Sequence, residues 1–178
     1  MKALKVVIAV IIVVVSIGLV VFIGASMYAV TTINLLSNSV YYAQRMSHKE
    51  GTEPDLVMLI ENMGSIYTPK IEGIRYDDDG RNFIENSTNL TGKPTNFSEF
   101  DGGYGYSDKN DVSYKFDKNF ELEWAIDKDY KKINLATVDE KKIKEEIRET
   151  VQPVLDVQPK PRINLQWLFN KKYQDRFN

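Results

Sequence analysis

One uninterrupted apolar stretch near the N-terminus constrains this chain more than any other feature. Residues 6–30, VVIAVIIVVVSIGLVVFIGASMYAV, contain no charged side chain. A helix rises 1.5 Å per residue, so a helix of this length exceeds the roughly 30 Å hydrocarbon core of a bilayer. Because lipid offers the backbone no hydrogen-bond partner, even the β-branched residues of this stretch are expected to be helical. The stretch therefore predicts a single transmembrane helix.

The charges that flank this stretch predict its orientation. Lys2 and Lys5 precede it, and the next charged side chain is Arg45. Basic residues mark the cytoplasmic end of a membrane span. We therefore expect residues 1–5 to be cytoplasmic and residues 51–178 to form an extracytoplasmic domain held at the plasma membrane.

The alternative interpretation of the same stretch is a cleaved signal peptide. Gly24, Ala25 and Ser26 supply small residues of the kind that a signal peptidase recognises, and cleavage there would release a secreted ligand-binding domain. The apolar core is longer than the 7–15 residues usual in such signals, which favours the uncleaved anchor. The chain contains no Cys, so the outer domain is expected to be stabilised by its core alone.

The composition beyond the apolar stretch is that of one mildly acidic domain. All 25 acidic residues follow the stretch, together with all of the 23 basic residues except Lys2 and Lys5. A mildly negative surface argues against nucleic-acid binding. The expected partners are the lipid bilayer and another protein of the envelope, or a second copy of the chain.

The membrane helix is predicted to continue outward as a stalk over residues 31–50, because no Gly or Pro occurs between Val30 and Gly51. Ile33, Leu36 and Val40 recur on one side of this stalk at the spacing of a helix that packs against something. Either the protein's own sheet or another helix could cover this stripe. The three residues are therefore candidate partner-binding residues.

A long loop is predicted over residues 86–111, which are rich in Asn, Ser, Thr and Gly. Loops of this length within a compact domain are usually functional or disordered. Its aromatic residues either hold the loop against the domain or contact a partner, which makes Tyr104 and Tyr106 further candidates.

Alternating apolar residues predict strands on both sides of this loop. A bent strand is expected over residues 65–76, followed by a tight turn at residues 77–80, DDDG. The clearest alternation predicts an antiparallel meander over residues 112–116, 120–126 and 133–135.

The C-terminal third is predicted to add one helix and one strand. Thr137 and Glu140 have the spacing of a capping box, and the helix that they begin is expected to stop at Pro153. Beyond it, apolar residues at every second position predict a last strand over residues 163–170. Trp167, within this strand, is the last candidate partner-binding residue.

The side chains of the common catalytic and metal sites are scarce. The chain has no Cys, and its one histidine, His48, lies between Ser47 and Lys49 at the end of the predicted stalk. No His/Cys metal spacing and no Ser-x-x-Lys pair occurs. We therefore expect no catalytic residues, no metal site and no cofactor.

Together these features predict an α+β fold. A transmembrane helix continues into a stalk helix that packs on a curved antiparallel β-sheet, with a further helix and a C-terminal strand. The expected function is that of a non-catalytic accessory or assembly subunit of a cell-envelope or secretion complex.

A hydrophobic N-terminal helix that leads into an amphipathic stalk and a β-meander resembles, in outline, the type IV pilins and pseudopilins. The resemblance implies a structural, filament-forming subunit as the alternative function. The chain departs from the glycine-plus-glutamate processing pattern of that family, because its first glycine is Gly18 and its first acidic residue is Glu50.

Overall fold

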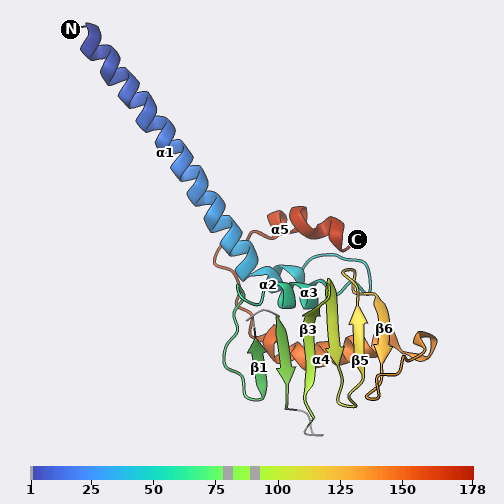
Figure 1. Cartoon of the computed structure of the whole chain (residues 1–178). Coiled ribbons are helices and arrows are strands. Elements are labelled where there is room, and N and C mark those ends of the chain that lie inside the picture. Colours follow the sequence, from blue (N-terminus) through green and yellow to red (C-terminus); the bar gives the residue numbers. More distant parts are fainter. Residues whose placement is uncertain (1, 78–81, 89–92) are drawn as a thin grey trace.

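The N-terminal helix α1, Lys2–Ser37, projects from the body of the protein (Figure 1). The structure is a computed structural model that describes residues 2–77, 82–88 and 93–178. The side chains of residues 11–30 are exposed and do not pack against the body. By length and composition, Ile11–Ser37 is sufficient to cross a membrane, in agreement with the sequence prediction.

The predicted continuous stalk over residues 31–50 is wrong, because the helix breaks at Asn38. Helix α2, Ser39–Ala43, follows the break, and α3, Pro54–Glu61, packs against α2. The Asn38 side chain donates a hydrogen bond to the Asn34 carbonyl, at 2.8 Å. Such local side-chain bonds stabilise non-helical backbone conformations. The break lets Val40 enter the core of the domain.

A six-stranded antiparallel meander forms the centre of the domain, with its strands in the order in which they occur along the chain. The strands are β1 Ile74–Asp77, β2 Phe83–Asn86, β3 Thr95–Phe100, β4 Gly103–Ser107, β5 Ser113–Phe116 and β6 Leu122–Ile126. The hairpin predicted before β2 is present, but most of its turn lies outside the described residues. In place of the predicted third run at 133–135, the structure has a single bridge between Ile126 and Lys132 and a 3₁₀ turn, Leu135–Thr137.

The prediction of a long loop over residues 86–111 is wrong, because β3 and β4 form there and pair with each other. Phe97, Tyr104 and Tyr106 point to the same face of the sheet and are buried. Burial of these three aromatic side chains outweighs the weak strand propensity of the Asn, Ser and Gly residues around them.

Helix α4, Glu140–Asp156, crosses one face of the sheet and contacts β2 and β3 (Figure 1). Ile143, Ile147 and Val151 are buried on its inner side, at the helical spacing seen in the sequence. Two details differ from prediction. The N-cap is Asp139, whose carboxylate accepts a hydrogen bond from the Lys142 amide at 3.1 Å, and the helix continues through Pro153.

The predicted C-terminal strand is instead a helix, α5, Gln166–Tyr173, followed by a 3₁₀ turn, Gln174–Arg176. Leu165, Phe169 and Tyr173 are spaced four residues apart, so a helix directs all three to one side. Phe169 is fully buried against Tyr42 of α2, with ring centroids 5.4 Å apart. The helical arrangement buries an aromatic ring that an edge strand would leave half exposed.

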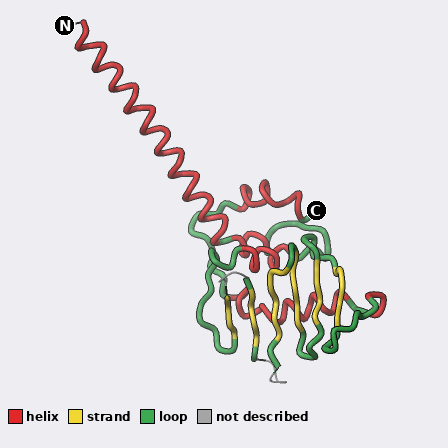
Figure 2. Tube along the Cα trace, in the orientation of Figure 1, coloured by secondary structure: helices red, strands yellow, loops and turns green. Residues whose placement is uncertain are grey.

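The helices gather on one face of the sheet. Helices α3 and α4 contact the sheet, α2 packs on α3, and α5 packs on α2. Figure 2 shows that none of the described helices lies over the opposite face. We call this uncovered surface the open face.

Candidate functional site

The six residues predicted to bind a partner occupy different parts of the structure. Val40, Tyr104 and Tyr106 are buried in the core, so their side chains present no surface to a partner. Leu36 is partly buried. Ile33, at the end of α1, and Trp167, on α5, are 65% and 67% exposed. Only these two keep the exposure that a binding residue needs, and they lie on neighbouring elements.

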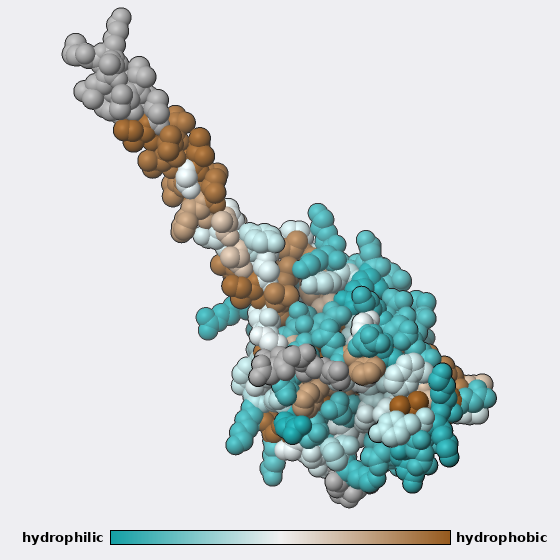
Figure 3. All heavy atoms as spheres, in the orientation of Figure 1, coloured by the Kyte–Doolittle hydropathy of each residue, from teal (hydrophilic) through white to brown (hydrophobic). Residues whose placement is uncertain are grey.

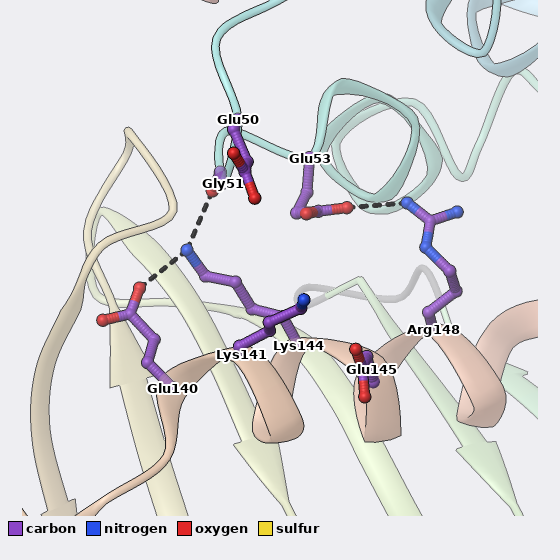
Figure 4. A pocket seen from close by; sticks show the side chains of 8 residues that line it. All are labelled: Glu50, Gly51, Glu53, Glu140, Lys141, Lys144, Glu145 and Arg148. Atoms are coloured by element: carbon purple, nitrogen blue, oxygen red, sulfur yellow. Dashed lines mark hydrogen bonds and ion pairs between the residues drawn. The ribbon is translucent and has the colours of Figure 1, made fainter.

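A charged pocket of about 330 Å³ lies between residues 50–53 and α4 (Figure 4). Arg148 reaches up from α4 and donates hydrogen bonds to Glu53 and Asp55, both at 2.7 Å. Lys144 pairs with Glu140 at 2.6 Å and donates to the Gly51 carbonyl at 2.8 Å. The hydrogen bonds to Asp55 raise the pKa of Arg148 above its usual range.

The contacts within this pocket join the chain before α3 to α4. Figure 4 shows Lys144 and Arg148 directed at the opposite wall, where Gly51 and Glu53 lie, and Lys144 also paired with Glu140 on α4 itself. The hydrogen bonds and ion pairs of Lys144 and Arg148 favour a structural function for these two residues.

A second polar cluster joins the C-terminus to the core. Arg176 donates hydrogen bonds to both carboxylate oxygens of Glu61, at 2.6 and 2.8 Å, and to the Tyr104 hydroxyl at 2.9 Å. That hydroxyl donates to Glu61 at 2.7 Å. The cluster was not predicted, because its members are far apart in sequence and belong to different elements.

The protonation states of this cluster follow from its hydrogen bonds. Burial alone would raise the pKa of Glu61, but the hydrogen bonds from Arg176 and Tyr104 outweigh burial and lower this pKa. Burial and the adjacent carboxylate raise the pKa of Tyr104 well above its usual range. Glu61 is therefore ionised and Tyr104 protonated at neutral pH, whereas a general acid or base works best with a pKa near the working pH.

The open face carries another pocket, of about 390 Å³, which we call the open-face cleft. Phe100 and Trp124 meet edge to face beside it, with ring centroids 6.2 Å apart. Gly105 adds no side chain to its floor. The residues that line the cleft are Asn96, Ser98, Phe100, Gly105, Tyr106, Ser107, Ser113, Tyr114, Trp124 and Ile126.

The lining of the open-face cleft is uncharged. It consists of aromatic and aliphatic side chains, hydroxyl and amide groups, and a glycine. Tyr106 and Tyr114 are opposite each other in the strand register and share the helix-covered face with Tyr104, so their phenol groups point away from the open face. Apolar walls with a few neutral hydrogen-bonding groups suit a binding site for a neutral part of a partner.

Lys115 is a buried cation next to this cleft. It lies on β5 opposite Gly105, and its side chain is 4% exposed. Its Nζ atom donates hydrogen bonds to the Phe116 carbonyl at 3.0 Å and to Glu123 at 3.1 Å. The cation is thus satisfied within the domain.

Sequence reasoning missed the open-face cleft because its residues meet only through strand pairing. The alternation of β6 placed Trp124 on one face of a strand, but Phe100 fell within the supposed loop.

Among the described residues, no group of three or more His, Cys, Asp or Glu side chains is arranged to hold a metal ion. Comparison with protein-family models, with characterised proteins and with solved structures found no match to this chain.

Proposed function

We propose that this chain is a single-pass plasma-membrane protein that presents a non-catalytic binding domain outside the cytoplasm. It would act as an accessory or assembly subunit of a cell-envelope or secretion complex. Lys2 and Lys5 support a cytoplasmic N-terminus, because no other charged residue occurs before Arg45. The membrane crossing is supported by the length and composition of α1.

The main support for a binding function is the open-face cleft. An antiparallel sheet commonly leaves one face to solvent, and that face is then mostly polar. Here the exposed face carries the Phe100–Trp124 pair beside an uncharged cleft. Aromatic side chains at a surface bury large areas on association and often dominate binding energy.

Site-specific photo-crosslinking in native membranes tests this proposal. A photoreactive phenylalanine analogue replaces Phe100 or Trp124, which keeps an aromatic ring at each position. The matched control is Tyr130, which is 86% exposed on the turn between β6 and residue 131. We expect the same membrane or envelope protein to be captured from both cleft positions, to be identified by mass spectrometry, and to be absent at Tyr130.

The captured protein must also copurify with the native chain, and a Trp124→Ala variant must lose it. Capture of the same proteins from Tyr130 as from the cleft would contradict a specific docking face. Turnover of a substrate by the purified full chain, with no partner at either cleft position, would contradict the non-catalytic function.

A further inference from the structure

The chain around the start of α5 is fixed against the last turns of α1. The Asn34 amide donates a hydrogen bond to the Ile163 carbonyl at 3.3 Å. The Tyr42 hydroxyl lies 3.1 Å from the same carbonyl and accepts a hydrogen bond from the Leu165 amide at 3.1 Å. Figure 1 shows α5 beside the end of α1, on the side of the body toward which α1 projects.

The depth of this contact follows from helix geometry. Asn34 lies four residues beyond Val30, which corresponds to about 6 Å along the helix axis. The headgroup layer adds about 5–7 Å on each side of the hydrocarbon core. When residues 6–30 fill that core, Asn34 and its partner Ile163 lie at the level of the lipid headgroups.

The surface at this level combines apolar and basic side chains. Ile163 is 59% and Trp167 is 67% exposed. Lys160, Arg162, Lys171 and Lys172 flank them in the sequence and are exposed, and in the part of the chain that the structure describes none of these four forms an ion pair. Figure 3 shows hydrophobic atoms continuing from α1 onto the adjoining part of the body. We call these six residues the α5 surface.

The charge of this region is opposite to that of the whole chain. Residues 159–178 contain five basic side chains and one acidic side chain, Asp175, whereas the chain has a net charge of −2. Tryptophan concentrates at the headgroup level of membranes, and basic side chains are attracted to anionic lipid surfaces. An exposed tryptophan and a cluster of basic side chains both fit an anionic lipid bilayer.

We infer that the α5 surface binds the anionic phospholipid headgroups of the bilayer that α1 crosses. Trp167 and Ile163 enter the interface, and Lys160, Arg162, Lys171 and Lys172 contact lipid phosphates. This inference rests on the proposed membrane crossing by α1. It adds a second attachment, which limits how the domain tilts and keeps the open-face cleft at a defined orientation to the membrane.

Spin labels at single cysteines measure this contact in the full chain, since the native sequence contains no Cys. The labelled positions are Ile163→Cys, Val20→Cys in the apolar part of α1, and Tyr130→Cys far from it. Each protein is placed in vesicles of phosphatidylcholine with phosphatidylglycerol. Accessibility to oxygen and to a water-soluble nickel complex then gives the depth of each label.

We expect the label at 20 to lie in hydrocarbon, the label at 130 in water, and the label at 163 to be severalfold less accessible to nickel than the label at 130. The Lys171→Glu/Lys172→Glu variant, or vesicles of phosphatidylcholine alone, should expose the label at 163. The matched control, Lys131→Glu/Lys132→Glu, should leave it shielded.

Three results would overturn the inference while leaving the membrane crossing intact. The first is a label at 163 as accessible as that at 130, with position 20 shielded. The second is shielding at 163 that neither charge reversal nor loss of anionic lipid changes. The third is spin–spin broadening at 163 that disappears on dilution with unlabelled chain, because a second copy would then cover the surface. Exposure of position 20 to water would instead contradict the proposed function itself.

Discussion

At the scale of single residues, Tyr42 joins three helices through one buried side chain. Its hydroxyl lies 2.8 Å from the Asn34 side-chain oxygen on α1 and accepts a hydrogen bond from the Leu165 amide next to α5. Its backbone carbonyl accepts a further hydrogen bond from Gln166 at 2.8 Å. The position of α5 relative to α1 therefore depends strongly on this residue.

Tyr42→Phe should lower the free energy of unfolding by about 1–3 kcal/mol, because the Leu165 amide and the Asn34 side chain lose a buried partner. Urea unfolding of the full chain in detergent micelles, followed by tryptophan fluorescence, measures the change. Tyr41→Phe is the control, since the structure shows no hydrogen bond to the Tyr41 hydroxyl within the described residues. Equal losses of unfolding free energy in the two variants would contradict the role assigned to the Tyr42 hydroxyl.

The Glu61–Arg176 pair makes stability depend on pH in a defined direction. The pKa of Glu61 is lower in the folded protein than its ordinary value. Its contribution to stability is therefore complete above the ordinary carboxyl pKa and is lost as the pH falls through the folded pKa. Glu61→Gln should lower the free energy of unfolding at neutral pH. In acid, the unfolding free energies of the variant and the native chain should be closer to each other. A difference in unfolding free energy that stays constant from neutral to acidic pH would refute this.

At the scale of elements, prediction succeeded where one periodicity was unambiguous. The buried side of α4 and the presence of strands β5 and β6 were readable from the sequence. The alternation in β6 gave the wrong face, because the structure buries Ala125 and leaves Trp124 on the open face. Residues 163–170 were assigned wrongly because Leu165 and Phe169 satisfy a period of two as well as a period near four, and only contact with Tyr42 selects the helix. The open-face cleft was not predictable, because Phe100 and Trp124 meet only once the register of four strands is known.

The pairing of β4 with β5 depends on the absence of a side chain at Gly103. A Cβ atom there would lie 2.1 Å from the Phe116 carbonyl oxygen, which is backbone and cannot turn away. Gly103→Ala should therefore cost about 1–3 kcal/mol of unfolding free energy through overpacking. Gly105→Ala is the matched control, because its Cβ would meet the side chains of Phe100 and Ser98 at 3.2 Å. The same unfolding measurement should show a smaller loss for Gly105→Ala, and a larger loss there would be contrary to expectation.

At the scale of the whole molecule, the chain separates into an exposed apolar helix and a folded domain of opposite character. The side chains of residues 11–30 find no cover in the domain, although they are among the most hydrophobic of the chain. Exposure of so large an apolar surface to water is unfavourable, and a bilayer removes it. The proposed binding domain, its orientation and the α5 surface all depend on this placement.

Labelling of single cysteines in intact cells with a membrane-impermeant maleimide tests that placement most directly. Tyr130→Cys should be labelled in intact cells, and Ala3→Cys only after the membrane is opened. The protein should remain in the membrane fraction with the mass of the full chain. Labelling of Ala3→Cys but not Tyr130→Cys in intact cells would contradict the orientation. Recovery of a soluble product that begins near Met27 would contradict the membrane anchor.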